Sequence, residues 1–174
     1  FHSPAHVAAR LAEAEGNMTG EAAAPLLDYH DVWARKPILR AVYGDLFERM
    51  LARRIPGPSR EIGGGVGGLK ARAHDLISSD IQHASWLDLV ANAQSLPFAD
   101  ETLSTIFMLD VLHHIEFPAL FFREAERALR PGGRIVLVEP AITPGSSLFY
   151  RLVHHEPVRM AADPLADGAP DPAR

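Results

Sequence analysis

Cysteine is absent from the 174 residues of this chain, so disulfide bonds and cysteine-ligated metal sites are excluded. A reducing compartment is therefore permitted, and we expect a cytoplasmic location. No apolar run approaches the roughly 18 residues that a membrane-spanning helix needs. No signal peptide is visible in these residues, and because the chain starts at Phe1 instead of Met we expect that its natural N-terminus is absent.

Basic side chains are fewer than acidic ones, 17 against 22, and the net charge is -5. Nucleic-acid binding needs clustered Lys and Arg, so this balance argues against it. The basic residues between Arg35 and Arg60 are spread along a helical pattern and fit a solvated face. Hydrophobic residues make up 47% of the chain, enough for a soluble domain with a real core.

Glycine is concentrated in residues 60–68, and this stretch organises the rest of the chain. Glycine tolerates positive φ and has no Cβ, so the backbone can turn tightly there and approach a ligand closely. A helix beginning at this turn would offer unpaired N–H groups to an anionic group. The stretch is typical of a cradle for a nucleotide-type cofactor.

Hydrophobic periodicity and breakers predict alternating strands and helices around this cradle. Pro118 lies in the first turn of the last helix, and Pro131-Gly132-Gly133 is expected to end it. We expect helices at Ile38–Arg54, Leu69–Ala73 (short) and Pro118–Leu129, and strands at Ser59–Ile62, Leu76–Ser79, near Val90, at Leu103–Leu109 and at Ile135–Val138.

This alternation predicts an α/β fold with a Rossmann-like, doubly wound, mainly parallel sheet and helices on both faces. Ligands of such sheets bind beyond the carboxyl ends of the strands. One polar residue follows or closes each predicted strand, and these residues are Glu61, Asp80, Asn92, Asp110 and Glu139. Little after Tyr150 resembles a strand, so we expect that the last strands of the sheet are missing from this chain.

Residues 1–55 are expected to form an N-terminal helical extension or lid, which includes an Ala-rich helical pattern at Pro4–Glu15. Within it, Tyr29 and Trp33 either cover a pocket or anchor the following helix by packing. Residues 56–160 form the expected cofactor-binding domain. Residues 161–174 are rich in Pro, Asp, Ala and Gly and are expected to be disordered.

Two cofactor motifs compete at the glycine stretch. Gly63-x-Gly65-x-x-Gly68 satisfies the dinucleotide pattern, with Asp80 as a ribose ligand. The alternative is Glu61-x-Gly63-x-Gly65-x-Gly67, with an acidic residue two positions before the first glycine. Four later blocks favour the alternative, and they are Ile77-Ser78-Ser79-Asp80, Asn92-Ala93-Gln94-Ser95-Leu96-Pro97-Phe98, Leu109-Asp110-Val111-Leu112-His113-His114-Ile115 and Leu129-Arg130-Pro131-Gly132-Gly133-Arg134.

In this order and spacing the blocks resemble the class I S-adenosylmethionine-dependent methyltransferases, especially small-molecule and quinone-biosynthesis enzymes. The resemblance covers residues 59–140 and implies S-adenosylmethionine as the cofactor. An NAD-dependent oxidoreductase is the less favoured alternative. The helix after the glycines is shorter than the family norm, which puts that edge of the cofactor site in question.

The resemblance also implies individual roles. Gly63, Gly65 and Gly67 would line the methionine part of the cofactor, and Glu61 would help hold its ammonium, directly or through water. Asp80 would accept hydrogen bonds from the ribose hydroxyls. Four further positions would complete the site: Ile81 against the adenine, Asn92 facing the adenine amino group where Asp is usual, Ala93 by backbone contact, and Leu109 through its carbonyl near the ammonium.

Methyl transfer from a sulfonium requires mainly alignment, and a general base only where the acceptor must lose a proton. His113 and His114 are the candidate catalytic residues, because His titrates near neutral pH. The alternative is that either one packs at a helix start and hydrogen-bonds to backbone. For Asp110 two roles are equally supported, a helix cap and a functional acid.

We expect no metal, because His154 and His155 are adjacent and would point in different directions. Phe149, Tyr150 and Leu152 would instead form a helix on the acceptor side. The predicted function is methyl transfer to a small molecule. No Asn-Pro-Pro-Tyr-type block follows the fourth strand, which within this superfamily favours O- or C-methylation. A non-catalytic binding or partner subunit with the same fold is the alternative, and the oligomeric state stays open.

Overall fold

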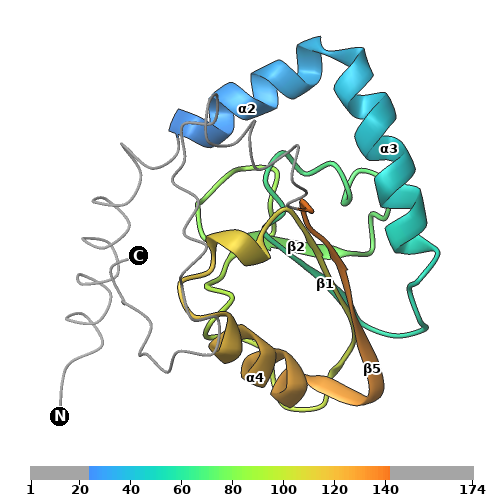
Figure 1. Ribbon diagram of the computed structural model, residues 1–174, viewed down its shortest axis with the longest axis vertical. Coiled ribbons are helices and arrows are strands. Elements are labelled where there is room, and N and C mark those ends of the chain that lie inside the picture. Colours follow the sequence, from blue (N-terminus) through green and yellow to red (C-terminus); the bar gives the residue numbers. More distant parts are fainter. Residues whose placement is uncertain (1–23, 142–174) are drawn as a thin grey trace, which may run out of the picture.

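The computed structural model describes residues 24–141. Two helices, α2 (Ala24–Arg35) and α3 (Pro37–Leu51), precede the sheet, and a short 3-10 helix, η1 (Leu112–His114), leads into α4 (Pro118–Ala128). The strands are β1 (Ser59–Ile62), β2 (Ile77–Asp80), β3 (Leu89–Val90), β4 (Leu103–Leu109) and β5 (Leu129–Val138). Figure 1 shows α3 and α4 on opposite sides of the sheet.

The strand order is β3-β2-β1-β4-β5, and every pairing between neighbours is parallel. The predicted α/β fold with a doubly wound parallel sheet is confirmed. The chain adds β2 and β3 on one side of β1 and then returns to add β4 and β5 on the other. The order therefore switches between β1 and β4, and ligands of such sheets bind outside the carboxyl ends at this switch.

β4 forms the centre of the core because its side chains alternate between the two faces of the sheet. Ile106 and Met108 pack with Phe121 of α4, whereas Phe107 packs with Phe47 of α3 in a second cluster. All five of these side chains are at most 4% exposed. Burial of each contributes about 1.5–3 kcal/mol, so β4 ties both helical layers to one strand.

The helical region before the sheet is packed onto it through aromatic side chains. Trp33 of α2 meets Tyr43 edge-on at a ring-centroid distance of 5.7 Å and contacts Phe47 at 6.3 Å. The packing interpretation of Trp33 is therefore confirmed, while Tyr29 is exposed. α3 ends three residues before the predicted Arg54, since Ala52 and Arg53 already form a turn ahead of Pro56.

The predicted strand Leu76–Ser79 is shifted by one residue to Ile77–Asp80, and two further predictions were wrong. Residues 69–73 form turns rather than a short α-helix, because a glycine-rich start makes helix nucleation too costly. Pro131-Gly132-Gly133 does not end α4, which stops at Ala128, but lies within β5. Pairing with the long β4 extends β5 backwards to Leu129, with an irregular register between Leu103 and Thr105.

Several expectations lie outside the described residues. They concern the Pro4–Glu15 helix, the Phe149–Leu152 helix, the His154–Glu156 block, the missing C-terminal strands and the tail. Among residues 24–141, no helix is long and apolar enough to cross a bilayer. No group of three or more potential metal ligands occurs in that same part of the chain.

Candidate functional site

The glycine loop, residues 63–68, leaves the end of β1 with three residues at positive φ: Gly63 (72°), Gly65 (47°) and Gly67 (73°). A side chain is strained in this conformation, so the alternation of glycines is required by the backbone. A Cβ on Gly63 would overlap Val111, so Gly63 must also be small. A Cβ on Gly65 would meet nothing within 4 Å, so the loop is open on that side.

The loop is bound to the end of β2 by backbone hydrogen bonds. Gly65 N–H donates to Asp80 Oδ2 at 3.0 Å, and Gly64 N–H donates to the Ser79 carbonyl at 2.8 Å. The other oxygen of Asp80 accepts the N–H of Gln82 at 3.0 Å. Because each carboxylate oxygen can accept two hydrogen bonds, Asp80 keeps acceptor capacity beside the open side of the loop.

Trp86 is a contact of the glycine loop that the sequence patterns missed. Its indole N–H donates to the carbonyl of Gly65 at 2.8 Å, and its ring lies against Gly67. On its other side it stacks on His30 of α2, with ring centroids 4.2 Å apart. These residues are far apart in the chain and share no motif, so only the fold could reveal that α2 reaches the loop through Trp86.

Glu61 lies beneath the loop instead of in its open side. Its residue is 5% exposed, and its Oε2 accepts the Ser78 hydroxyl at 2.5 Å. Burial raises the pKa of Glu61 to about 7, against the opposing effect of the Ser78 hydrogen bond. A Cβ placed on Gly64 would stand 3.2 Å from the same carboxylate oxygen, so the loop backbone covers it.

Ile81, Asn92 and Ala93 lie beyond the ends of β2 and β3. Ile81 is 44% exposed next to Asp80 and offers free apolar surface. Asn92 Oδ1 accepts the N–H of Gln94 at 2.8 Å, which shapes the turn after β3. Ala93 is partly buried against the α4-side core. The Ala91 N–H donates to the carbonyl of Asp80 at 2.9 Å, so these positions adjoin the β2 end.

The end of β4 carries Leu109, which packs toward α3, and Asp110, which has a φ of 57°. Tyr43 of α3 donates its hydroxyl hydrogen to Asp110 Oδ2 across 3.4 Å. Burial, together with the nearby negative charge of Glu139, raises the pKa of Asp110. Asp110 is therefore a partly buried acid beside the glycine loop, and its conformation matches the tolerance of Asp for positive φ.

His113 and Glu139 form the most directional pair of the site. Glu139 Oε2 lies 2.6 Å from His113 Nδ1, and Oε1 accepts the N–H groups of Val111 and Leu112 at 2.9 and 2.8 Å. Burial would raise the pKa of Glu139, but His113 and the two N–H donors outweigh it and lower that pKa. The adjacent His114 ring lies 4.0 Å from the His113 ring and is exposed.

The predicted residues thus fall into three connected places at one edge of the sheet. These are the glycine loop with Asp80, the β4 end with Tyr43, and the His113–Glu139 pair. Val111 connects the β4 end and the His113–Glu139 pair to the glycine loop. It packs against Gly63 and donates its N–H to Glu139. Asn92 and Ala93 adjoin the β2 end, and within residues 24–141 the Asn92 side chain accepts the N–H of Gln94 and makes no hydrogen bond to the loop.

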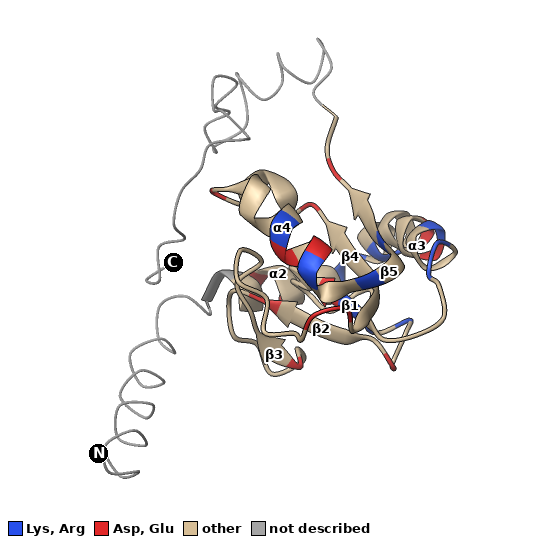
Figure 2. Ribbon diagram, turned by 90° about the horizontal axis from the view of Figure 1, so that it is seen from below, with Lys and Arg blue, Asp and Glu red and all other residues tan. Residues whose placement is uncertain are grey.

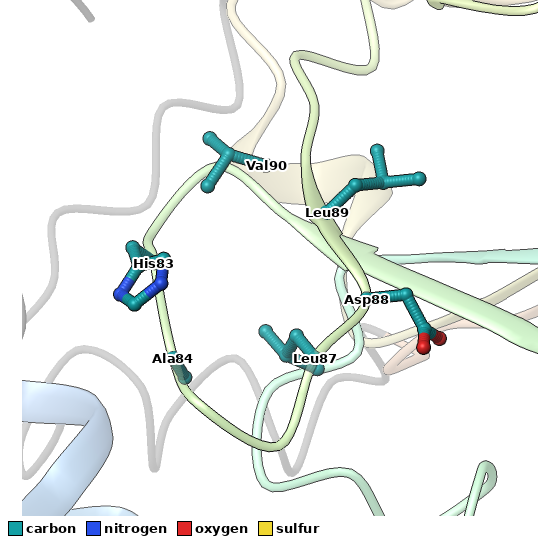
Figure 3. Close-up of a pocket in the computed structure, with 6 residues that line it drawn as sticks. All are labelled: His83, Ala84, Leu87, Asp88, Leu89 and Val90. Carbon is teal, nitrogen blue, oxygen red and sulfur yellow. The ribbon is translucent and has the colours of Figure 1, made fainter. Parts of the chain in front are cut away.

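A small cavity of about 60 Å³ lies in the β2–β3 connection, lined by His83, Ala84, Leu87, Asp88, Leu89 and Val90. Figure 3 shows the carboxylate of Asp88 directed away from the other lining residues. Ligand pockets usually enclose about 300–1,000 Å³, so this cavity cannot hold a nucleotide-type cofactor. The candidate site is therefore the open side of the glycine loop and not this cavity.

Comparison with known proteins finds a family model and similar sequences that match parts of this chain. Residues 64–137 match the model of a family described as a methyltransferase domain. A demethylmenaquinone methyltransferase from Streptomyces griseus is 34% identical over 85 residues, which cover 47% of this chain and 35% of that protein.

Two further relatives match shorter segments. A 27-O-demethylrifamycin SV methyltransferase from Amycolatopsis mediterranei is 37% identical over 54 residues, 31% of this chain and 20% of that protein. A tRNA U34 carboxymethyltransferase from Nautilia profundicola is 33% identical over 64 residues, 37% of this chain and 20% of that protein. The matched segments thus span about a third or less of each relative.

A solved structure agrees with the fold. The crystal structure of a SAM-dependent methyltransferase from Thermotoga maritima superposes with a TM-score of 0.54 at 19% identity, covering 62% of this chain and 56% of that chain. At this identity the likeness concerns the fold alone. Residues 64–137 of this chain thus match a methyltransferase domain, and the order of the glycine, Asp80, His-His and Pro-Gly-Gly blocks is similar to that of the class I S-adenosylmethionine-dependent methyltransferases.

Proposed function

We propose that this chain belongs to an enzyme that transfers a methyl group from S-adenosylmethionine to a small molecule. The observation that carries the proposal is the extent of the family match, residues 64–137. This segment starts inside the glycine loop and ends in β5, and it contains Asp80, Asn92 and His113. The match therefore includes part of the candidate site, whereas Glu61, Gly63 and Glu139 lie just outside it.

The geometry of the loop fits this cofactor. Gly65 leaves open space where any other residue would place a Cβ, and Asp80 keeps free acceptor positions next to that space. In the proposal Gly63, Gly65 and Gly67 line the methionine part, and Asp80 binds the ribose hydroxyls. Ile81, Asn92 and Ala93 accommodate the adenine, the Leu109 carbonyl faces the methionine end, and Glu61 supports that end from below the loop.

S-Adenosylmethionine, when bound, supplies a methyl group already activated by a positively charged sulfur. The chain therefore has to position the acceptor, exclude water and, for a hydroxyl or an acidic carbon, accept a proton. His113 is the proposed base. Its Nδ1–H donates to Glu139, which leaves the lone pair of Nε2 available to accept that proton. Glu139 thereby fixes both the tautomer and the direction of the ring.

A small-molecule acceptor is favoured over RNA by charge. The chain is acidic, with a net charge of -5, whereas RNA-binding surfaces are positively charged. In the view of Figure 2, Lys and Arg lie beside Asp and Glu on α3 and α4 instead of gathering on one face. Two of the three relatives are named for small-molecule substrates, and one of those names specifies a 27-O-demethyl compound. O- or C-methylation is therefore proposed.

Calorimetry and a transfer assay on the full-length protein test the proposal. We expect S-adenosylhomocysteine to bind, Asp80→Asn to weaken that binding, and Asp75→Asn to leave it unchanged. Asp75 is the matched control because it is an exposed Asp that precedes β2 and pairs with Arg54. Tritiated methyl groups should then pass from the donor into a metabolite fraction and not into RNA. Binding without any transfer would instead indicate a non-catalytic subunit.

A further inference from the structure

The carbonyl of Gly65 receives its hydrogen bond from a side chain. An α-helix after the loop would donate a backbone N–H to this carbonyl, but residues 69–73 form turns. The indole N–H of Trp86 donates to it instead, at 2.8 Å. The N–H of Gly65 donates in turn to Asp80 Oδ2 at 3.0 Å. Side chains from β2 and from the β2–β3 connection therefore fix both backbone polar groups of Gly65.

Aromatic side chains from three segments also pack against the end of the glycine loop. A Cβ on Gly67 would stand 3.0 Å from Trp86, in the β2–β3 connection. A Cβ on Gly68 would stand 2.7 Å from Phe47 of α3 and 3.2 Å from Trp33 of α2. The loop therefore contacts both Trp86 and the two N-terminal helices, so a movement of α2 changes what the loop packs against.

α2 is fixed to α3 at its carboxyl end. Arg40 of α3 donates to the carbonyls of Trp33 and Ala34 at 2.6 Å each. A cation suits this position because the last carbonyls of a helix carry partial negative charge. The chain then bends at Lys36, which has a φ of -110° and a ψ of 93°, and Figure 1 shows α2 and α3 meeting there at an angle. Lys36 is therefore the point about which α2 can turn.

Nearer its amino end, α2 contacts the β2–β3 connection through the ring of His30. This ring stacks on Trp86, with ring centroids 4.2 Å apart and an interplanar angle of 22°. On the same half of α2, Leu27 and Tyr29 are 55% and 64% exposed. One aromatic stack contributes little compared with a helix packed on a core, so it can form or break without disturbing the sheet.

We propose that Trp86 is a positioning residue that fixes the glycine loop for cofactor binding, and that its stack on His30 docks α2 onto the occupied loop. This inference rests on the proposed function and adds a conformational step to it. A bound cofactor on the open side of Gly65 restricts this residue and, through the hydrogen bond, the indole of Trp86. The ring face that receives His30 is then held in place, so docking of α2 loses less conformational entropy.

Calorimetry and amide hydrogen exchange on the full-length protein test this coupling. S-Adenosylhomocysteine should slow exchange in α2 by roughly three- to tenfold, the range expected for one aromatic stack. Coupling between two equilibria is reciprocal, so the docked α2 should raise the affinity for this ligand by the same factor. Binding without slower exchange in α2 would overturn the inference alone. A wild-type protein that does not bind the ligand would overturn the proposed function as well.

Variants at the two ends of the contact separate its parts. His30→Ala removes the stack and keeps the indole hydrogen bond, and it should weaken S-adenosylhomocysteine binding by roughly three- to tenfold and abolish the slower exchange in α2. Trp86→Phe should cost at least as much affinity, because it releases Gly65 as well as α2. The double variant should bind no more weakly than Trp86→Phe alone, since consecutive contacts that act as one unit are not additive.

Two further variants serve as controls. Tyr29→Ala removes an exposed aromatic ring from the neighbouring position of α2, and it should keep the slower exchange and leave the affinity within about twofold. His30→Phe restores a ring for stacking and should recover both properties. Additive losses in the double variant, or slower α2 exchange that persists in His30→Ala, would overturn the inference and leave the proposed function intact. His30 lies outside both core clusters, so His30→Ala tests the inference even where Trp86→Phe does not fold.

Discussion

Glu139 holds His113 at the end of the sheet, with Oε2 of the carboxylate 2.6 Å from Nδ1 of the ring. The other carboxylate oxygen accepts two N–H groups at the start of η1, so the glutamate cannot turn away without losing them. The pair therefore combines a structural anchor with control over one histidine nitrogen. In the proposed function, the base His113 would thus be directed by Glu139, the residue that follows β5.

Replacement of Glu139 by Gln is expected to lower kcat roughly tenfold or more with little change in cofactor affinity. An amide N–H facing Nδ1 would make that nitrogen the acceptor and move the ring proton to Nε2, where it blocks proton uptake. His113→Gln should lower kcat by about 10²-fold or more, the usual contribution of a general base. The measurement is the pH dependence of kcat and KM with an acceptor identified by the transfer assay.

His114→Gln separates the two histidines in the same assay. His114 is exposed, and its ring lies against the His113 ring. Its replacement should therefore change kcat by less than about threefold. A tenfold change in kcat would correspond to about 1.4 kcal/mol of activation free energy. A loss in His114→Gln that equals the loss in His113→Gln would argue against the directed pair as the base.

Glu61→Gln is expected to change how stability depends on pH. The pKa of Glu61 is about 7 in the folded protein, against an ordinary value of 4.5 that applies to the unfolded chain. Between these two pH values the folded state therefore keeps a proton that the unfolded state has lost. The contribution of Glu61 therefore falls as pH rises through this window, by about 3 kcal/mol in total. Above pH 7 the loss is complete.

Gln carries no charge and still accepts the Ser78 hydroxyl, so the variant should not show this fall. Urea unfolding of both proteins at pH 5 and pH 8 measures the difference, and subtracting one protein from the other cancels the titration of other groups. The variant should gain stability over the wild type from pH 5 to pH 8. An equal difference at both pH values would show that Glu61 does not carry the raised pKa.

Gly65→Ala should weaken S-adenosylhomocysteine binding by more than its effect on folding explains. At a φ of 47° the substitution strains the backbone by about 1–2 kcal/mol, and the new methyl group enters the open side of the loop. Gly132→Ala is the matched control. Gly132 has a φ of 80° and equally open surroundings, but it lies in β5 away from the loop.

Both glycine variants should therefore lose similar stability in urea unfolding, while Gly65→Ala alone loses cofactor affinity in calorimetry. If Gly132→Ala lost the same affinity, the effect at Gly65 would reflect general destabilisation of the fold. If neither lost affinity, the open side of the loop would not be the cofactor cradle.

Trp86→Phe tests whether the indole fastens the glycine loop. Phe keeps an aromatic ring for stacking on His30 but cannot donate to the carbonyl of Gly65. The lost hydrogen bond should cost about 1 kcal/mol and increase amide hydrogen exchange in residues 63–68. His30→Ala is the companion variant, since it removes the stack and keeps the hydrogen bond. Unchanged exchange in both variants would contradict a fastening role.

The sequence was most informative where a local pattern has one physical outcome. The predicted bounds of β1 and β4 agree with the structure, because a short apolar, β-rich run such as Leu103–Leu109 is typical of a strand buried on both faces. The predicted start of α4 at Pro118 was also right, since Pro is suited to the first helical turn. The prediction of a helix after the glycine loop was wrong. Burial of its few apolar side chains could not offset the conformational entropy lost in ordering the preceding glycines.

Partners within the site could not be read from the chain in the same way. Residues 61, 80, 92, 110 and 139 were expected at strand ends because that follows from strand boundaries alone. The pairing of His113 with Glu139 depends on β5 lying next to β4, and the burial of Glu61 depends on the loop folding back over Ser78. Hydrogen bonds require particular distances and directions, so they follow only after the strand order is set.

By itself, then, the sequence determined the parallel α/β fold, the glycine loop and the edge of the sheet where the candidate site lies, since these follow from periodicity and backbone freedom. The tertiary structure decided which carboxylate is enclosed, which one is accessible and which histidine is directed. These properties depend on the packing of segments that are distant in sequence. Burial and partner geometry set the charge and direction of a side chain, and neither is encoded in the identity of the residue alone.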